Sequence, residues 1–143
     1  VDLETLLRTS DFVSVNCALT PETHHLMNAD RLALMKPTAY LINTARGPIV
    51  DQAALTAALS ARRLAGAALD VFDTEPVDPN DPILRLDNVI VTPHAICWTD
   101  ECFHNMASTG LASIVDALSR RVPEFVVNRD ALEHPRVRAW FAA

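Results

Sequence analysis

Three side chains suited to acid/base and anion chemistry, Arg46, Glu75 and His94, each lie a few residues after a short apolar run in the 143-residue sequence. The guanidinium of arginine offers a planar set of donors that matches a carboxylate. The imidazole of histidine titrates near neutral pH, and a carboxylate within hydrogen-bond reach favours its protonated form. Together, these residue types predict a proton-transfer site for a 2-oxo or 2-hydroxy acid, with the hydride carried by a cofactor.

The apolar runs have the length and the β-branched content of buried strands, and they cover residues 12–17, 39–43, 67–72 and 89–92. Helical patterns separate them. Asn28 can cap a helix over 29–35, and Asp51 can cap a second helix over 52–63. Gly66 lies just beyond that helix, where a helix end and a tight entry into the next strand are expected. This alternation predicts an α/β fold with a parallel sheet covered by helices on both faces.

In open parallel sheets, ligands bind outside the carboxyl ends of the strands. Arg46, Glu75 and His94 follow three such ends, so we expect them at one edge of the sheet. Each residue alone has an ordinary alternative: a solvated arginine, a loop carboxylate beside a proline, or a structural histidine. Their joint position favours the functional interpretation.

The remaining segments are less regular. Residues 73–88 contain three prolines, which predicts a loop with at most a short helical turn over 83–86. A long helix is predicted over 99–120, with Thr99 as its cap, followed by a tail with a short extended piece and at most a terminal turn of helix. The segment 1–8 has helical spacing and no initiator Met, so we expect the sequence to start inside a larger protein.

Composition excludes several classes of function. The net charge of −6 argues against a nucleic-acid footprint, and no apolar run approaches the roughly 20 residues of a membrane helix. The three cysteines are predicted to be reduced thiols of a cytoplasmic protein. Cys97, Cys102 and His104, or the His24–His25 pair, could be considered as metal ligands. They lack the usual zinc spacing and a fourth ligand, so no metal site is predicted.

Four ordered stretches carry a family resemblance: LLRTSDFVSVNCALTPETHHLMN, LMKPTAYLINTARGPIVDQAALTAAL, LAGAALDVFDTEP and LDNVIVTPHA. From about Leu3 to His94, the sequence resembles the NAD-binding half of the D-isomer-specific 2-hydroxyacid dehydrogenases. The resemblance implies that Arg46 binds the substrate carboxylate, that His94 is the catalytic acid/base and that Glu75 is the acid paired with it. It implies an oxidoreductase that uses NAD or NADP on a small 2-oxo or 2-hydroxy acid and forms a homodimer.

The resemblance also implies cofactor contacts. Asp70 is similar to the family aspartate that contacts the nicotinamide carboxamide. The cofactor would further be lined by Cys17, Ala18, Thr44, Ala45, Arg46 and His94. Gly47 and Gly66 would serve close packing and tight turns. A non-enzymatic alternative is a binding module like the corepressor relatives, which use NAD as a conformational signal. Turnover on a panel of 2-oxo acids discriminates between the two.

The chain has only three glycines, so it contains no G-x-G-x-x-G phosphate loop. We therefore expect the second half of a Rossmann-type doubly wound parallel sheet over 1–98. Residues 99–143 are expected to form a long interdomain helix and tail that would pack on a substrate domain absent from this sequence. The 143-residue chain alone is expected neither to bind NAD tightly nor to turn over.

Overall fold

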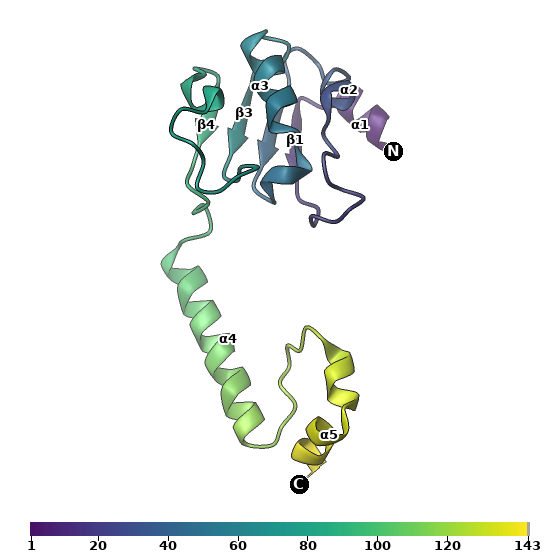
Figure 1. Cartoon of the computed structure of the whole chain (residues 1–143), viewed down its shortest axis with the longest axis vertical. Helices are drawn as coiled ribbons and strands as arrows, with labels where there is room; N and C mark the ends of the chain where they lie inside the picture. Colours follow the sequence, from purple (N-terminus) through teal and green to yellow (C-terminus); the bar gives the residue numbers. More distant parts are fainter. Residues whose placement is uncertain (143) are drawn as a thin grey trace. The chain divides into compact units, whose positions relative to one another are not determined.

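A computed structural model describes residues 1–142, whose contacts divide into two compact units. The first unit is Val1–Ile96, and the second begins at Cys97. Along the chain, the first unit contains α1 (Leu3–Thr9), β1 (Phe12–Val15), α2 (Ala29–Leu32), β2 (Tyr40–Asn43), the 3-10 turn η1 (Gly47–Ile49), α3 (Gln52–Ser60), β3 (Gly66–Leu69), the 3-10 turn η2 (Pro82–Arg85) and β4 (Val89–Val91) (Figure 1).

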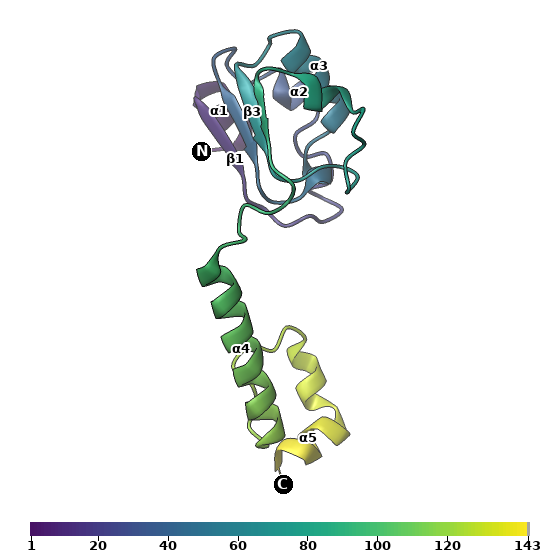
Figure 2. The same ribbon diagram turned by 90° about the vertical axis from the view of Figure 1, so that its left-hand side faces the viewer.

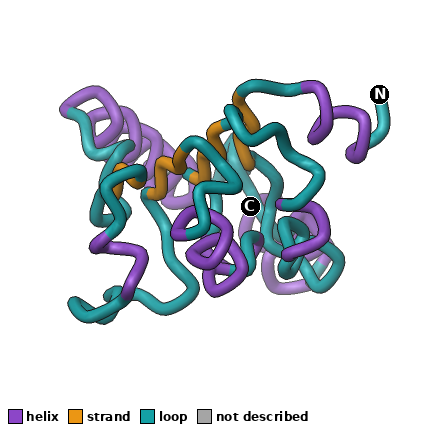
Figure 3. The backbone as a smooth tube through the Cα atoms, turned by 90° about the horizontal axis from the view of Figure 1, so that it is seen from above, coloured by secondary structure: helices purple, strands orange, loops and turns teal. Residues whose placement is uncertain are grey.

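The four strands form one parallel sheet in the order β1-β2-β3-β4. α2 connects β1 to β2, and α3 connects β2 to β3. Seen from above, the strands make a single layer (Figure 3), and α2 and α3 lie on the same side of it (Figure 2). Repeated parallel crossovers in one direction are what one half of a doubly wound sheet requires. The predicted α/β fold is confirmed.

Two predicted helix starts are also confirmed. The side chain of Asn28 accepts the backbone N–H of Arg31, and the side chain of Asp51 accepts that of Ala54. The end of α3 differs from the prediction, because Arg62, with φ of 52°, takes the left-handed position there. Gly66 instead belongs to β3, where an added Cβ would lie 2.6 Å from the carbonyl oxygen of Asn88. It serves close packing, not the helix end.

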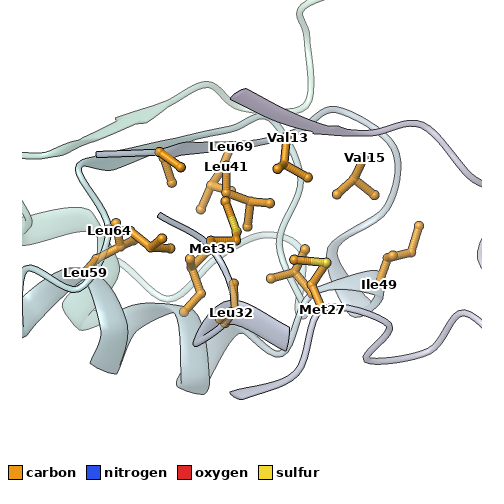
Figure 4. Close-up of a cluster of buried hydrophobic side chains, with 14 of the residues drawn as sticks. Val13, Val15, Met27, Leu32, Met35, Leu41, Ile49, Leu59, Leu64 and Leu69 are labelled. Atoms are coloured by element: carbon orange, nitrogen blue, oxygen red, sulfur yellow. The ribbon is translucent and has the colours of Figure 1, made fainter. Parts of the chain in front are cut away.

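The core lies between the sheet and the helices on one face (Figure 4). Val13, Val15, Leu41 and Leu69 project from the strands toward the side chains of α2, α3 and the turns around them. The opposing residues include Leu32, Met35, Leu59 and Leu64, all buried. Burial of this apolar cluster is the main source of stability for the unit and fixes the ends of the strands in space.

The opposite face of the sheet is different from what the sequence led us to expect. The exposed fractions of Phe12, Tyr40 and Ile90 are 66%, 44% and 71%. The rings of Phe12 and Tyr40 stack at 5.5 Å between centroids. Burial alternates along β1 and β2, as in a sheet covered on one side. Within Val1–Ile96, the expected helical cover on both faces is therefore wrong, and helices cover one face only.

The second unit contains α4 (Asp100–Leu118), η3 (Arg129–Glu133) and α5 (Pro135–Ala142). Thr99 caps α4 as predicted. Trp140 ties the end of the unit to α4, because its indole N–H donates to the carbonyl of Ala117 at 2.8 Å. The tail is more helical than predicted, whereas its packing on a substrate domain stays a prediction. None of the helices in residues 1–142 is long and apolar enough to cross a membrane.

Candidate active site

The carboxyl ends of β2, β3 and β4 bring Arg46, Glu75 and His94 to one edge of the sheet. All three side chains line a cavity of about 280 Å³, together with parts of the two loops that follow β2 and β3. These residues are up to 48 positions apart in the sequence. The sheet register joins them, since neighbouring parallel strands end side by side. The structure thus places together the three side chains that the sequence assigned to one edge.

His94 and Glu75 form a direct pair. Nδ1 of His94 lies 2.7 Å from Oε2 of Glu75, and the other carboxylate oxygen accepts the backbone N–H of Phe72 at 3.0 Å. A neutral imidazole in this position carries its proton on Nδ1 and presents Nε2 as the acceptor. The exposed fractions of the two side chains are 43% for His94 and 37% for Glu75. The pair is therefore open to a ligand in the cavity.

The carboxyl group of Glu75 is held in its ionised form. Burial raises its pKa, but hydrogen bonds from His94 and from the amide of Phe72, together with the charges of His94 and Arg46, lower the pKa below its ordinary value. An ionised carboxylate beside Nδ1 stabilises the imidazolium that forms when His94 takes up a proton. Glu75 thus orients the ring and supports its charged state.

Arg46 lies at the rim of the cavity, exposed, with Nη1 donating to the carbonyl of Ala45 at 2.6 Å. It takes part in none of the salt bridges formed among residues 1–142. A guanidinium that forms no salt bridge with a protein carboxylate can bind the carboxylate of a ligand in bidentate form. This geometry suits the role that the resemblance implies for Arg46.

Asn43, the last residue of β2, holds the loop that carries Arg46. Its side chain is almost fully buried, donates to the carbonyl of Arg46 at 3.0 Å and accepts the N–H of Ala45 at 3.1 Å. Its own carbonyl accepts the N–H of Asp70 from the next strand at 3.0 Å. Asn43 therefore supplies hydrogen-bond partners to the backbone of the turn after β2 and joins that turn to the sheet.

Two further polar side chains hold the other loops. The carboxylate of Asp70 accepts hydrogen bonds from Thr92, Ala95 and Ile96, on both sides of His94. The side chain of Gln52 accepts the N–H of Asp73 at 3.0 Å and donates to Asp81 at 2.8 Å, which anchors the segment around Glu75 to the start of α3.

Gly47 is required where the loops after β2 and β3 meet. A Cβ added to Gly47 would lie 1.9 Å from the carbonyl oxygen of Phe72 and 2.6 Å from the backbone nitrogen of Asp73. Real side chains do not tolerate such distances, so the close approach of the two loops depends on glycine at this position. Gly47 therefore brings Arg46 within reach of the Glu75 segment.

The other predicted cofactor residues lie at the same edge. Cys17 and Ala18 follow β1, and Thr44 and Ala45 follow β2, whose last residues pair in register. Ala18 and Thr44 are exposed, whereas Cys17 and Ala45 pack partly on the core. These positions leave small side chains and backbone along the edge, and their contact with a cofactor stays a prediction.

The histidines and cysteines considered as metal ligands do not converge. Within residues 1–142, no group of three or more His, Cys, Asp or Glu side chains could hold a metal ion. His24 and His25 stack on each other at 4.1 Å between ring centroids. Cys17, Cys97 and Cys102 are free thiols.

Comparison with known proteins identifies the family of this chain. The profile described as D-isomer specific 2-hydroxyacid dehydrogenase, NAD binding domain, matches residues 1–95, which is the unit that holds the site. The chain belongs to this dehydrogenase family. A glyoxylate reductase of Thermofilum pendens is 48% identical over 132 residues, covering 92% of this chain and 39% of the relative. The glyoxylate/hydroxypyruvate reductase B of Shigella boydii is 45% identical, covering 89% and 39%.

Solved structures of dehydrogenases in this family have the same fold. A D-isomer specific 2-hydroxyacid dehydrogenase of Xanthobacter autotrophicus, in complex with NADPH and MES, has a TM-score of 0.63 and 52% identity, covering 64% of this chain and 29% of that one. The NAD-complexed enzyme of Lactobacillus delbrueckii has a TM-score of 0.82 and 31% identity, covering 89% and 43%. The chain thus spans about 40% of the length of the curated relatives it matches.

Sequence reasoning missed the side chains that hold the dehydrogenase loops: Asn43, Thr92 and Gln52. A signal existed for Asn43, because a lone amide at the end of the apolar run AYLIN must find partners when buried. For Thr92 the sequence predicts only the end of a strand, and the partner of its hydroxyl lies 22 positions away. For Gln52 the sequence predicts only the first residue of a helix.

Proposed function

We propose that this chain provides the substrate-carboxylate and proton-transfer site of an NAD(P)-dependent D-2-hydroxyacid dehydrogenase. The observation that carries the proposal is the convergence of Arg46, Glu75 and His94 on one cavity, with Nδ1 of His94 2.7 Å from Glu75. The reaction interconverts a D-2-hydroxy acid and its 2-oxo acid. The family match and the names of the relatives support this class of reaction.

The chemistry follows from the geometry. Arg46 binds the carboxylate of the acid through its planar donors and so orients the neighbouring carbonyl or hydroxyl carbon. In the oxidative direction, Nε2 of His94 takes the hydroxyl proton, and in the reductive direction it returns a proton to the carbonyl oxygen. Glu75 holds the proton on Nδ1 throughout and stabilises the imidazolium. A nicotinamide cofactor, when bound, supplies or accepts the hydride.

The residues of this chain fit the nicotinamide end of such a cofactor. Cys17, Ala18, Thr44 and Ala45 follow two strands whose ends pair in register, and they leave small side chains along the edge. Asp70 is proposed near the carboxamide, since one of its oxygens accepts only a single hydrogen bond from the chain. Relatives hold NADPH or NAD, which supports either cofactor here.

The substrate is proposed to be a small 2-oxo acid such as glyoxylate or hydroxypyruvate, which the relatives' names specify. We also propose a cytoplasmic homodimer that binds neither nucleic acid nor membrane. The net charge of −6 supports the absence of nucleic-acid binding. Light scattering on the purified protein tests the dimer.

A chimera tests the function directly. The aligned segment of the Thermofilum glyoxylate reductase, 132 residues long, would be replaced by the matching residues of this chain. We expect NADH or NADPH oxidation with glyoxylate, hydroxypyruvate or pyruvate. A folded chimera that binds the cofactor but turns over none of these acids would contradict the enzyme and favour a binding module that senses NAD.

The chain alone offers a second measurement. Because its three glycines form no phosphate loop, calorimetry on the 143-residue protein should detect no tight binding of NAD. Micromolar affinity would contradict this expectation and place a phosphate site elsewhere on the chain.

A further inference from the structure

Asp70 is an unusual residue for its place. It is the only carboxylate among the buried side chains of residues 1–142, with an exposed fraction of 3%. A buried carboxylate is costly unless hydrogen bonds satisfy it. Here the protein supplies three donors, all from the segment that follows β4: the hydroxyl of Thr92 at 2.6 Å and the amides of Ala95 and Ile96 at 2.9 and 3.3 Å.

We propose that Asp70 and Thr92 form a brace that fixes the backbone of His94, and that both are positioning residues for proton transfer. The inference rests on the proposed acid/base role of His94. It adds the hydrogen bonds that position this residue for proton transfer. It also assigns to Asp70 a function toward the protein itself, beyond its predicted contact with the cofactor.

The brace holds the chain on both sides of His94. Thr92 lies two residues before it, whereas Ala95 and Ile96 directly follow it. His94 itself has φ of 54°, a left-handed conformation that non-glycine residues rarely adopt. A segment with this backbone relaxes unless its neighbours are held in place. Asp70, the first residue after β3, provides that restraint from the segment that also carries Glu75.

The two residues that hold His94 therefore both lie in the segment that follows β3. Glu75 lies five residues after Asp70, and its Oε1 accepts the amide of Phe72 in the same segment. Asp70 holds the backbone next to His94, at the amide of Ala95, while Glu75 holds the ring of His94 at Nδ1. His94 is thus restrained in two ways, because Asp70 holds the backbone on either side of it and Glu75 holds the imidazole at Nδ1.

The three donors require a carboxylate at position 70. Oδ1 accepts from Thr92 and Ala95, and Oδ2 accepts from Ile96, so both oxygens act as acceptors. An asparagine has one acceptor oxygen and would turn an N–H toward one of these donors. The hydrogen bonds outweigh burial, which by itself raises the pKa of Asp70, and they lower the pKa so that the group stays ionised.

Amide hydrogen exchange on the 143-residue protein tests the brace without any activity. In Asp70→Asn, exchange at Ile96 and Ala95 should accelerate roughly ten- to hundredfold, since a hydrogen bond to a charged acceptor is lost or weakened. Thr92→Val should accelerate exchange at Ala95 roughly tenfold, and Thr92→Ser should restore it. Thr9→Val is the matched control, because it removes a hydroxyl that bonds a backbone carbonyl in α1.

Rates within about twofold of the wild type at both amides, in both Asp70→Asn and Thr92→Val, would overturn the brace. If Asp70→Asn does not fold, the exchange rate of Ala95 in Thr92→Val tests the brace by itself, since valine matches threonine in shape and lacks only the hydroxyl.

Kinetics of the chimera test the catalytic consequence. Thr92→Val should lower kcat about tenfold and leave the KM for the cofactor unchanged, whereas Thr92→Ser should restore kcat. In a His94→Ala background, Thr92→Val should not lower kcat further, because the imidazole that the brace positions is absent. A raised cofactor KM with unchanged kcat would overturn the positioning role in favour of cofactor contact. A wild-type chimera without turnover would count against the proposed function, while the exchange rates would still decide the brace.

Discussion

The loops that carry Arg46 and His94 are held in place by two different kinds of hydrogen bonding. Each follows a strand, and a buried polar side chain at the end of a strand holds each one in place. Asn43 reaches its own loop, two and three residues further on, at Ala45 and Arg46. Asp70 reaches the segment that follows β4, 22 to 26 residues away.

The difference matters for folding and for mechanism. A local bond such as that of Asn43 can form as soon as the turn after β2 closes, because little chain entropy opposes it. The bonds of Asp70 require β3 and β4 to be paired first. The Arg46 loop is therefore set by the sequence around it, whereas the geometry of His94 depends on the completed sheet. We expect binding to depend on the first loop and proton transfer on the second.

The largest expected effect separates these two roles. In the chimera, His94→Ala should lower kcat by about two to four orders of magnitude, the usual contribution of a general acid/base. Arg46→Gln should mainly raise the KM of the 2-oxo acid, by roughly ten- to hundredfold, because it removes charged hydrogen bonds. Initial-rate kinetics give both values. A loss of less than about tenfold for His94→Ala would remove His94 from the acid/base role.

The second prediction concerns the contact between the loops after β2 and β3. Gly47→Ala places a methyl group 1.9 Å from the carbonyl oxygen of Phe72, so the loops must separate. We expect a loss of about 1–3 kcal/mol in the free energy of unfolding, measured by urea titration. Gly110→Ala is the control, since nothing lies within 4 Å of its added Cβ in the middle of α4. It should have no destabilising effect, and equal losses in both variants would contradict the close approach.

The third prediction sharpens the contrast between local and distant support. Asn43→Ala leaves the N–H of Ala45 and the carbonyl of Arg46 without their partner, which should cost about 1–3 kcal/mol of stability. Amide exchange should accelerate at Ala45 but not at Ile96, which Asp70 holds. Asn16→Ala removes exposed bonds to Ser14 and should change stability by less than about 0.5 kcal/mol. Faster exchange at Ile96 as well would show that the two loops are one unit.

The sequence predicted well what depends on local pattern. The strands, the caps Asn28 and Asp51, and the edge that unites Arg46 with His94 all follow from apolar runs and from the geometry of parallel sheets. It failed where the determinant is far away in the chain. The partners of Thr92 and Gln52 belong to other elements, and the uncovered face of the sheet depends on which helices pack there. Neither feature leaves a trace in a short window of residues.

The smallest expected effect is a dependence of stability on pH that requires the Glu75–His94 pair. The pKa of Glu75 is lowered in the folded protein, so its contribution to stability is present above the ordinary value of 4.5 and is lost as the pH falls through the folded pKa. His94→Ala removes a principal cause of the lowering. The pKa of Glu75 should therefore rise, and less stability should be lost between pH 7 and acid conditions.

Carbon-detected NMR of the Glu75 carboxyl group measures this shift, and urea unfolding across the same pH range measures its consequence. The pair is more than a third exposed, so the change in stability should be small. His104→Ala is the matched control, because that exposed histidine bonds Ser108 within α4. A carboxyl titration of Glu75 that is the same in the wild type and in His94→Ala would show that the pair does not persist in solution. The imidazole would then be held by the backbone brace alone.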